Sequence, residues 1–189
     1  MATIEERLDQ IYEIIQREEF MTHKGLGNEI GFYIFDYDPE DEMLVRAHIQ
    51  ALKNRLNTPS SKRRVVEFDL YSMFLSILEQ EGLLSELGSL EDEYGPDYLL
   101  EAVRDLASPE VYVQLIEAAE EDYDLVFLTG VGRVWPIVRS HTVLNNLHHV
   151  LDKTPVIMFF PGRYDGTELR LFDRIKDDNY YRAFSLVPR

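Results

Sequence analysis

The chain contains no cysteine. This absence excludes disulfide bonds, a thiolate nucleophile, and zinc or iron–sulfur sites that are held by cysteine. A cytoplasmic location fits a chain without disulfides, because disulfides persist in oxidising compartments. The length of 189 residues suits one domain over residues 1–189 with a proper hydrophobic core, the alternative being two very small domains.

Long apolar segments are missing as well. No stretch approaches the roughly 18 apolar residues that cross a bilayer. The first residues, MATIEERLDQIYEII, carry acids inside their apolar pattern, whereas a signal peptide needs a basic start and an unbroken apolar run. We therefore expect no membrane association and no secretion.

Common catalytic motifs are also absent. The chain has no P-loop string, in which Gly and four residues precede Gly-Lys-Ser/Thr, and no third glycine at the spacing of a dinucleotide-binding loop. No serine lies in a Gly-x-Ser-x-Gly elbow, so a hydrolase triad has no nucleophile. We expect no catalytic residue, no cofactor and no metal site, and hence no enzyme.

Basic residues are scarce before residue 125. The formal net charge is −16, and residues 125–189 hold nine Lys and Arg against six Asp and Glu, so the first 124 residues carry −19. The densest block, residues 79–124, has fifteen acids against one basic residue, Arg104. Such runs are usually solvated helix faces. The field of the whole molecule repels nucleic acid, and only the C-terminal third offers a surface that tolerates it.

Helical and apolar segments alternate along the chain. A capping box at Thr3 and Glu6 begins a helix over residues 4–15. Apolar runs predict strands at 29–36, 64–69, 124–129, 156–160, 169–172 and 181–187. Helical spacing and breakers predict further helices at about 39–56, 70–81, 135–151 and within 83–124.

Most of these strands are apolar on both faces and alternate with helices. That pattern is typical of a mainly parallel sheet that helices cover on both sides. The sequence therefore predicts an α/β fold: a single three-layer Rossmann-like domain, with an acidic helical insert over about 83–124.

A glycine turn follows the strand 124–129. Gly130 and Gly132 lie between this strand and a helix, where backbone N–H groups can cradle an anion. In such a sheet, ligands bind beyond the carboxyl ends of the strands. The alternative is that the two glycines only make the turn.

Arg133, Trp135, Arg163 and Tyr164 are the candidate partner-binding residues. The sequence predicts a turn at Gly130–Arg133 after the strand 125–129 and a turn at Pro161–Tyr164 after the strand 156–160. A single crossover joins these strands, so we expect both turns and the start of the helix at Trp135 at one sheet edge. Arg, Trp and Tyr are enriched at the energetic centres of protein interfaces. The alternative is that Trp135 belongs to the core and the arginines pair with local acids.

Asp36 and Asp69 each end a predicted strand. If those strands are neighbours, the two carboxylates can hold a magnesium ion in a metal-dependent enzyme. The alternative is that each aspartate caps the helix that follows it, which fits Asp69 best because a helical run begins directly after it. Asp38, followed by a proline, is also expected to be a helix N-cap.

Four segments resemble the BrxB family, components of bacterial BREX phage-defence systems. They are EIGFYIFDYDP at 29–39, FLTGVG with the following WP and RSH at 127–141, FFPGRY at 159–164, and YYRAF at 180–184. The residues of these segments, and the order of the segments along the chain, are similar to the signatures of that family over nearly the whole chain.

The resemblance implies an intracellular bacterial protein that is needed for defence against phage. The recognisable chemistry of such systems lies in other components: a DNA methyltransferase, a large ATPase, and PglZ, an alkaline-phosphatase-like protein. We therefore expect a non-catalytic adaptor or regulator that binds other BREX components, most of all PglZ. The alternative is a nucleotide- or nucleic-acid-binding regulator that uses the basic C-terminal third.

Overall fold

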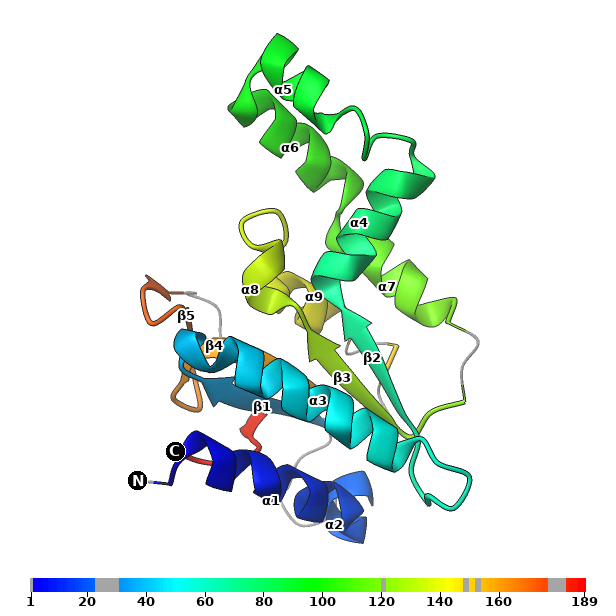
Figure 1. The fold of residues 1–189 in the computed structure, drawn as a ribbon, viewed down its shortest axis with the longest axis vertical. Coiled ribbons are helices and arrows are strands. Elements are labelled where there is room, and N and C mark those ends of the chain that lie inside the picture. Colours follow the sequence, from blue (N-terminus) through cyan, green and yellow to red (C-terminus); the bar gives the residue numbers. More distant parts are fainter. Residues whose placement is uncertain (1, 23–30, 120–121, 148–149, 152–153, 177–182) are drawn as a thin grey trace.

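A computed structural model gives the fold and describes residues 2–22, 31–119, 122–147, 150–151, 154–176 and 183–189 (Figure 1). The helices within them are α1 (Ile4–Gln16), α2 (Glu18–Thr22), a 3-10 turn (Pro39–Asp41), α3 (Glu42–Leu56), α4 (Leu70–Gln80), α5 (Leu87–Tyr94), α6 (Pro96–Leu106), α7 (Pro109–Glu117), α8 (Val131–Val134) and α9 (Ser140–Leu147). The strands are β1 (Phe32–Tyr37), β2 (Val65–Asp69), β3 (Leu125–Thr129), β4 (Val156–Tyr164), β5 (Leu169–Leu171), β6 (Ile175–Lys176) and β7 (Phe184–Ser185).

The strands form one sheet in the order β2-β3-β4-β1-β7. Every pairing along this path is parallel, with Phe32 opposite Val156 and Val66 opposite Val126. The hairpin strands β5 and β6 add to the end of β4 in antiparallel fashion. The predicted, mainly parallel sheet is confirmed.

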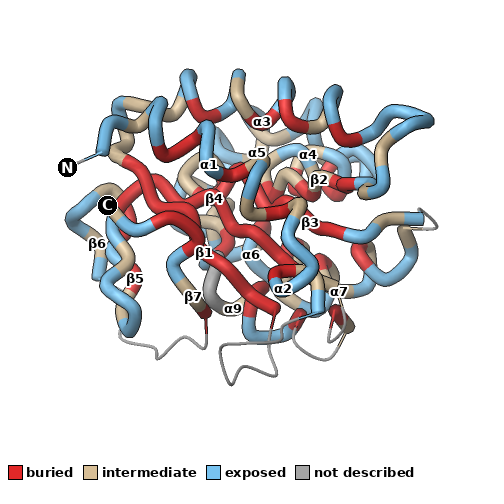
Figure 2. The backbone as a smooth tube through the Cα atoms, turned by 90° about the horizontal axis from the view of Figure 1, so that it is seen from below, coloured by how far each residue is buried: buried red, intermediate tan, exposed pale blue. Residues whose placement is uncertain are grey.

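Helices cover both faces of this sheet, and Figure 2 shows the buried strands between them. Successive residues of a strand point to opposite faces, so each strand supplies both layers. Phe35, Phe127 and Phe159 pack on one face against α1 and α3, whereas Phe32, Leu128 and Met158 pack on the other face against α4, α7, α8 and α9. The three-layer α/β fold is therefore confirmed.

The N-terminal helix begins as predicted. The Thr3 hydroxyl accepts a hydrogen bond from the Glu6 backbone N–H at 3.2 Å, and the Glu6 carboxylate accepts one from the Thr3 N–H at 2.8 Å. This reciprocal pair satisfies two donors that the first helical turn leaves free. Leu8, Ile11 and Ile15 are buried against the sheet.

The helix predicted over 135–151 is wrong at its beginning. The chain forms the short α8 directly after Gly130, leaves helical geometry at Trp135, and begins α9 only at Ser140. Trp135 is extended (φ −67°, ψ 138°). The cause is Pro136, because the ring of a proline excludes helical geometry from the residue before it.

The turn predicted at Pro161–Tyr164 is also wrong. These residues continue β4 and pair with β5, with Gly162 opposite Leu171 and Tyr164 opposite Leu169. The pairing needs a close backbone approach, since a Cβ at Gly162 would lie 2.1 Å from the Arg170 carbonyl oxygen. Glycine therefore lets the strand continue where the sequence indicated a turn.

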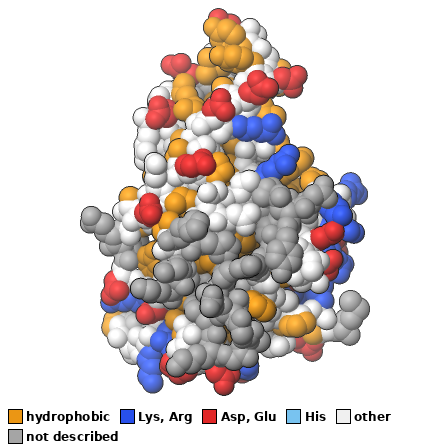
Figure 3. Space-filling model, turned by 180° about the vertical axis from the view of Figure 1, so that it is seen from behind, with side chains coloured by type: hydrophobic (Ala, Val, Ile, Leu, Met, Phe, Trp, Pro, Cys, Tyr) orange, Lys and Arg blue, Asp and Glu red, His pale blue; other side chains and the backbone are white. Residues whose placement is uncertain are grey.

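The acidic segment is helical, and α5 and α6 project away from the sheet (Figure 1). Acidic side chains are spread over this projecting end, and most of the Lys and Arg side chains in this view lie below it, along one side of the molecule (Figure 3). In contrast, α7 buries Tyr112 and Ile116 against the sheet. No helix of the described chain has the length and hydropathy needed to cross a bilayer.

The strand predicted at 29–36 is seen as β1, although residues 29 and 30 lie outside the described residues. The predicted final strand is reduced to Phe184–Ser185, which pairs with β1, and residues 181 and 182 again lie outside the described residues.

Candidate functional site

The parallel strands β1 to β4 end at one edge of the sheet, which we call the carboxyl edge. Asp36 lies near the end of β1, opposite Phe160 of β4, and Asp69 ends β2 opposite Thr129 of β3. Open α/β sheets bind their ligands at this edge. The site residues predicted from the sequence all lie at or beyond it.

The magnesium hypothesis for Asp36 and Asp69 required their strands to be neighbours, and they are not. Strands β3 and β4 lie between the strands that carry the two aspartates, so the carboxylates are not on neighbouring strands. Asp69 instead caps α4, as the alternative predicted, by accepting a hydrogen bond from the Ser72 N–H at 2.9 Å. Among the described side chains, no three of His, Asp or Glu gather closely enough to hold a metal ion.

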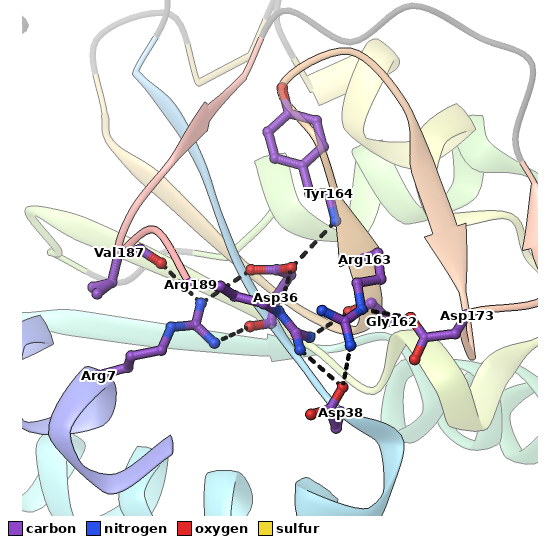
Figure 4. Close-up of polar contacts among 9 residues, drawn as sticks. All are labelled: Arg7, Asp36, Asp38, Gly162, Arg163, Tyr164, Asp173, Val187 and Arg189. Carbon is purple, nitrogen blue, oxygen red and sulfur yellow. Dashed lines mark hydrogen bonds and ion pairs between the residues drawn. The ribbon is translucent and has the colours of Figure 1, made fainter. Parts of the chain in front are cut away.

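Asp36 is the centre of a buried network of charges (Figure 4). Its carboxylate accepts hydrogen bonds from Arg7 at 3.0 Å, from Arg189 at 2.9 Å and from the Tyr164 backbone N–H at 3.2 Å. Arg7 and Asp36 are each 3% exposed. The prediction that Asp36 caps a helix is therefore wrong, because its carboxylate is a counterion for two arginines.

Asp38 belongs to the same network. Its Oδ1 accepts hydrogen bonds from Arg189 at 2.8 Å and Arg163 at 3.2 Å, and it makes no cap hydrogen bond to the following helix. The bond from Arg189 holds the pKa of Asp38 below its usual range, against the effect of burial. Asp38 thus occupies the predicted N-cap position before Pro39, but its carboxylate makes ion pairs in place of a cap hydrogen bond.

The sequence reasoning missed Arg7 and Arg189. Arg7 donates to the Asp36 carbonyl and the Val187 carbonyl, both at 2.8 Å, and thereby joins α1 to β1 and to the end of the chain. The burial of Arg7 could have been predicted, because Arg7 is three residues after Ile4 and four before Ile11 and therefore lies on the apolar stripe of the helix. Arg189 follows the last predicted strand, and no local pattern indicates its partners.

The two glycines predicted to bind an anion lie in different surroundings. Gly130 has a left-handed backbone (φ +74°), and a Cβ there would lie 2.5 Å from the Asp69 carboxylate. A Cβ at Gly132 would lie 2.9 Å from Phe172 and from Pro161. Close packing therefore explains both glycines, and anion binding by their backbone remains a prediction.

The four predicted partner-binding residues lie along the carboxyl edge on two elements, with Arg133 and Trp135 at α8 and its C-cap and Arg163 and Tyr164 in β4. Arg133 pairs with Asp69, and its guanidinium lies 5.3 Å from the Tyr71 ring. Arg163 pairs with Asp38 and Asp173, each at 3.2 Å. Both arginines thus pair with local acids, as the alternative predicted.

The two aromatic candidates differ in exposure. Trp135 is 39% exposed, so it is not a core residue. Its ring packs at a right angle to the Phe172 ring, with 6.4 Å between the two ring centroids. Tyr164 is half-buried, and its hydroxyl donates to the Ala183 carbonyl at 2.7 Å. Of the two, Trp135 offers the larger free apolar surface.

A cavity of about 490 Å³ opens at the carboxyl edge between α3 and the ends of β2 and β3. We call it the edge pocket. The charged side chains that line it are Glu42, Arg46, Glu67, Asp69 and Arg133, and Gly130 lies in its wall. The pocket therefore brings together Gly130 and Arg133, which the sequence singled out, with Arg46, which it did not.

Tyr37 forms part of the wall of the edge pocket. Its hydroxyl donates to Glu42 at 2.6 Å. Burial raises the pKa of Tyr37 above its usual value and Glu42 adds to this effect, while the nearby charges of Arg133 and Arg46 oppose it. The hydroxyl is therefore a neutral donor, and both guanidinium groups are close enough to act on it.

Known proteins resemble this chain over its full length. The family model described as BREX protein BrxB matches residues 66–186. A BREX protein BrxB of Bacillus cereus (strain H3081.97) is 52% identical over 193 residues, covering 100% of both chains. A BREX protein BrxB of Escherichia coli O9:H4 (strain HS) is 34% identical, covering 98% of this chain and 92% of its own.

No solved structure matches the chain. The resemblance noted from four short segments is thus supported by identity along the whole sequence, from the helix that carries Arg7 to the end of the sheet. The chain belongs to the BrxB family and is a component of a BREX defence system.

Proposed function

We propose that the protein is a non-catalytic adaptor or regulatory component of a BREX anti-phage complex in the cytoplasm, and that it acts through protein–protein contacts. The observation that carries this proposal is Trp135, a large aromatic side chain left 39% exposed at the edge where an α/β sheet places its binding surfaces. Arg163, with a side chain 48% exposed, lies at the same edge.

The proposed docking surface consists of Arg133, Trp135, Arg163 and Tyr164. Arginine and tryptophan are common anchors of interfaces, because each combines apolar contact area with N–H groups that can donate hydrogen bonds to the partner. Arg163 already shares the carboxylates of Asp38 and Asp173, which orient its guanidinium. A partner that docks here therefore meets a pre-organised charge. PglZ is the proposed partner.

Affinity purification from cells that carry the neighbouring BREX genes tests this proposal. The tagged wild-type protein should retain PglZ, and the double variant Arg133→Ala/Arg163→Ala should lose both PglZ and protection against phage while its circular dichroism stays unchanged. If the folded double variant binds and protects normally, the carboxyl edge is not the interface. The acidic block at 79–124 then becomes the next candidate.

The absence of catalysis is part of the same proposal. Asp36 and Asp69 lie on strands that two others separate, and each already pairs with arginine. We expect no ATPase, nuclease or phosphatase turnover by the purified protein. Turnover that copurifies with the wild type and vanishes in an Asp36→Ala or Asp69→Ala protein whose circular dichroism shows it to be folded would overturn this expectation.

The alternative, a nucleotide- or nucleic-acid-binding regulator, depends on the basic C-terminal third. Local acids neutralise several of its cations, in the pairs Arg163–Asp173, Lys176–Glu168 and Arg189–Asp36. The net charge of −16 also opposes a polyanion. A submicromolar complex with duplex DNA and a steep salt dependence would favour the alternative over the adaptor.

A further inference from the structure

The edge pocket has the size of a small-molecule site. It shares Arg133 with the proposed docking surface, but the adaptor function requires no small molecule there. Its volume of about 490 Å³ lies within the roughly 300–1,000 Å³ of typical ligand pockets. It lies beyond the carboxyl ends of β2 and β3, with the first turns of α3 as its other wall. The kind of ligand that fits the pocket depends on which of its charged side chains lack a partner within the chain.

The carboxylates of the pocket already have donors from this chain. Glu67 accepts hydrogen bonds from Thr129 at 2.7 Å, from Lys53 at 2.7 Å and from Gln50 at 3.0 Å. Each carboxylate that is paired in this way gains little from a further cation. Glu67 is thus a structural acceptor rather than a free ligand.

The other two acids are engaged as well. Asp69 accepts from the Ser72 N–H at 2.9 Å and pairs with Arg133, and Glu42 accepts from the Tyr37 hydroxyl at 2.6 Å. The negative charge of the pocket is therefore largely balanced from within the chain.

The two arginines retain unused donors. Within the described part of the chain, Arg46 forms no ion pair, and the hydrogen bond found for its guanidinium goes to the Met43 sulfur at 4.0 Å. The Nε of Arg133 is buried and has no hydrogen-bond partner among the described residues. The Arg133 side chain lines the pocket and is 30% exposed, so the outer part of its guanidinium can meet an acceptor there while one nitrogen stays paired with Asp69.

We propose that the edge pocket binds a phosphorylated molecule of the size of a nucleoside monophosphate, with its phosphate between Arg46 and Arg133. Guanidinium groups match phosphate geometry with two parallel hydrogen bonds. A phosphate alone would leave most of the cavity empty, and Met43, 70% exposed at the rim, offers apolar contact for the organic part. The overall negative charge acts weakly at this range, because salt screens charges beyond about 8–10 Å.

An NMR titration of the isolated, ¹⁵N-labelled protein tests this inference separately from partner binding. The probes are AMP, GMP, CMP and UMP, and inorganic phosphate alone. At least one nucleotide should shift the side-chain Nε–H signal of Arg133. Arg46→Gln should weaken that binding by about tenfold or more, the loss expected for hydrogen bonds to a charged group.

Arg55→Gln is the matched control, since Arg55 lies on the same helix, stacks on Tyr12 and is outside the pocket. It removes the same net charge, so its affinity for the nucleotide should stay within about twofold of wild type, as for a residue without contact. Equal weakening in both variants would overturn the assignment to the pocket. So would an Arg133 signal that no nucleotide moves at about 10 mM, or inorganic phosphate binding as tightly as the best nucleotide.

Discussion

Arg7 of the first helix donates a hydrogen bond of 3.0 Å to the carboxylate of Asp36 near the end of strand β1, and both side chains are buried. The same arginine binds the Val187 carbonyl. Through its ion pair with Asp36 and its hydrogen bond to Val187, Arg7 therefore connects the N-terminal helix to the sheet and to the end of the chain at the carboxyl edge. The docking surface and the edge pocket lie along that edge.

Asp36→Asn should lower the free energy of unfolding by about 3–5 kcal/mol. The substitution keeps the shape of the side chain but leaves Arg7 buried without its counterion, and removing one partner of a buried pair carries that cost. Urea denaturation at pH 7 measures the change. Asp38→Asn is the control, because its side chain is 39% exposed and its pairs should contribute about 1 kcal/mol or less. Similar losses in both variants would contradict the central role of Asp36.

Gly162→Ala should destabilise the protein by about 1–3 kcal/mol, the usual cost of forcing an extra methyl group into a packed site. Its Cβ would lie 2.1 Å from the Arg170 carbonyl oxygen, and a backbone atom cannot move aside as a side chain can. Thermal unfolding measures the effect. Gly88→Ala, with nothing within 4 Å of its Cβ, should be neutral or slightly stabilising. If both variants melt like wild type, β4 does not continue past Pro161 as described.

Stability should fall below about pH 6.5 in a way that depends on His48. Burial lowers the pKa of His48, while Asp9 and the Leu8 backbone oppose the shift, and its Nε2 is buried without a described partner. The folded state therefore keeps His48 neutral when the unfolded chain, with an ordinary pKa of about 6.5, takes up a proton. Stability is present above that pH and decreases as pH falls through it.

His48→Gln separates this effect from the titration of carboxylates. Unfolding free energies at pH 7.5, 6.5 and 5.5 should decline more steeply for the wild type than for the variant. Parallel curves for the two proteins would show that His48 does not titrate differently on folding.

The fold was predictable where local chemistry and burial agree. The capping box at Thr3 and Glu6 is a local signal for the start of a helix, and short apolar runs rich in β-branched and aromatic residues, such as Leu125–Thr129, favour strands that are buried on both faces. Two predictions failed. The helix predicted from Trp135 begins only at Ser140, and the residues from Pro161 to Tyr164, predicted as a turn because of their proline and glycine, continue a strand. A return strand, β5, decided the second of them, and pairing between strands is not a local property.

The site was predictable in location but not in composition. Strand ends indicate the carboxyl edge, so Asp36, Asp69 and Arg133 were found. Their partners depend on strand order, which placed two strands between the aspartates and removed the metal site. Arg46 looked like an ordinary surface cation on α3, and only the cavity beside it gives it a possible ligand.

The affinity of the purified protein for purified PglZ, compared with that of Trp135→Ala, tests the adaptor proposal most directly. The account predicts binding by the wild type and a loss of about 30-fold or more in the variant, which corresponds to the 2 kcal/mol of an interface anchor. Tyr94→Ala, which removes an aromatic ring 51% exposed on the projecting α5, should bind like wild type. A folded Trp135→Ala protein that binds PglZ as tightly as wild type would contradict docking at the carboxyl edge.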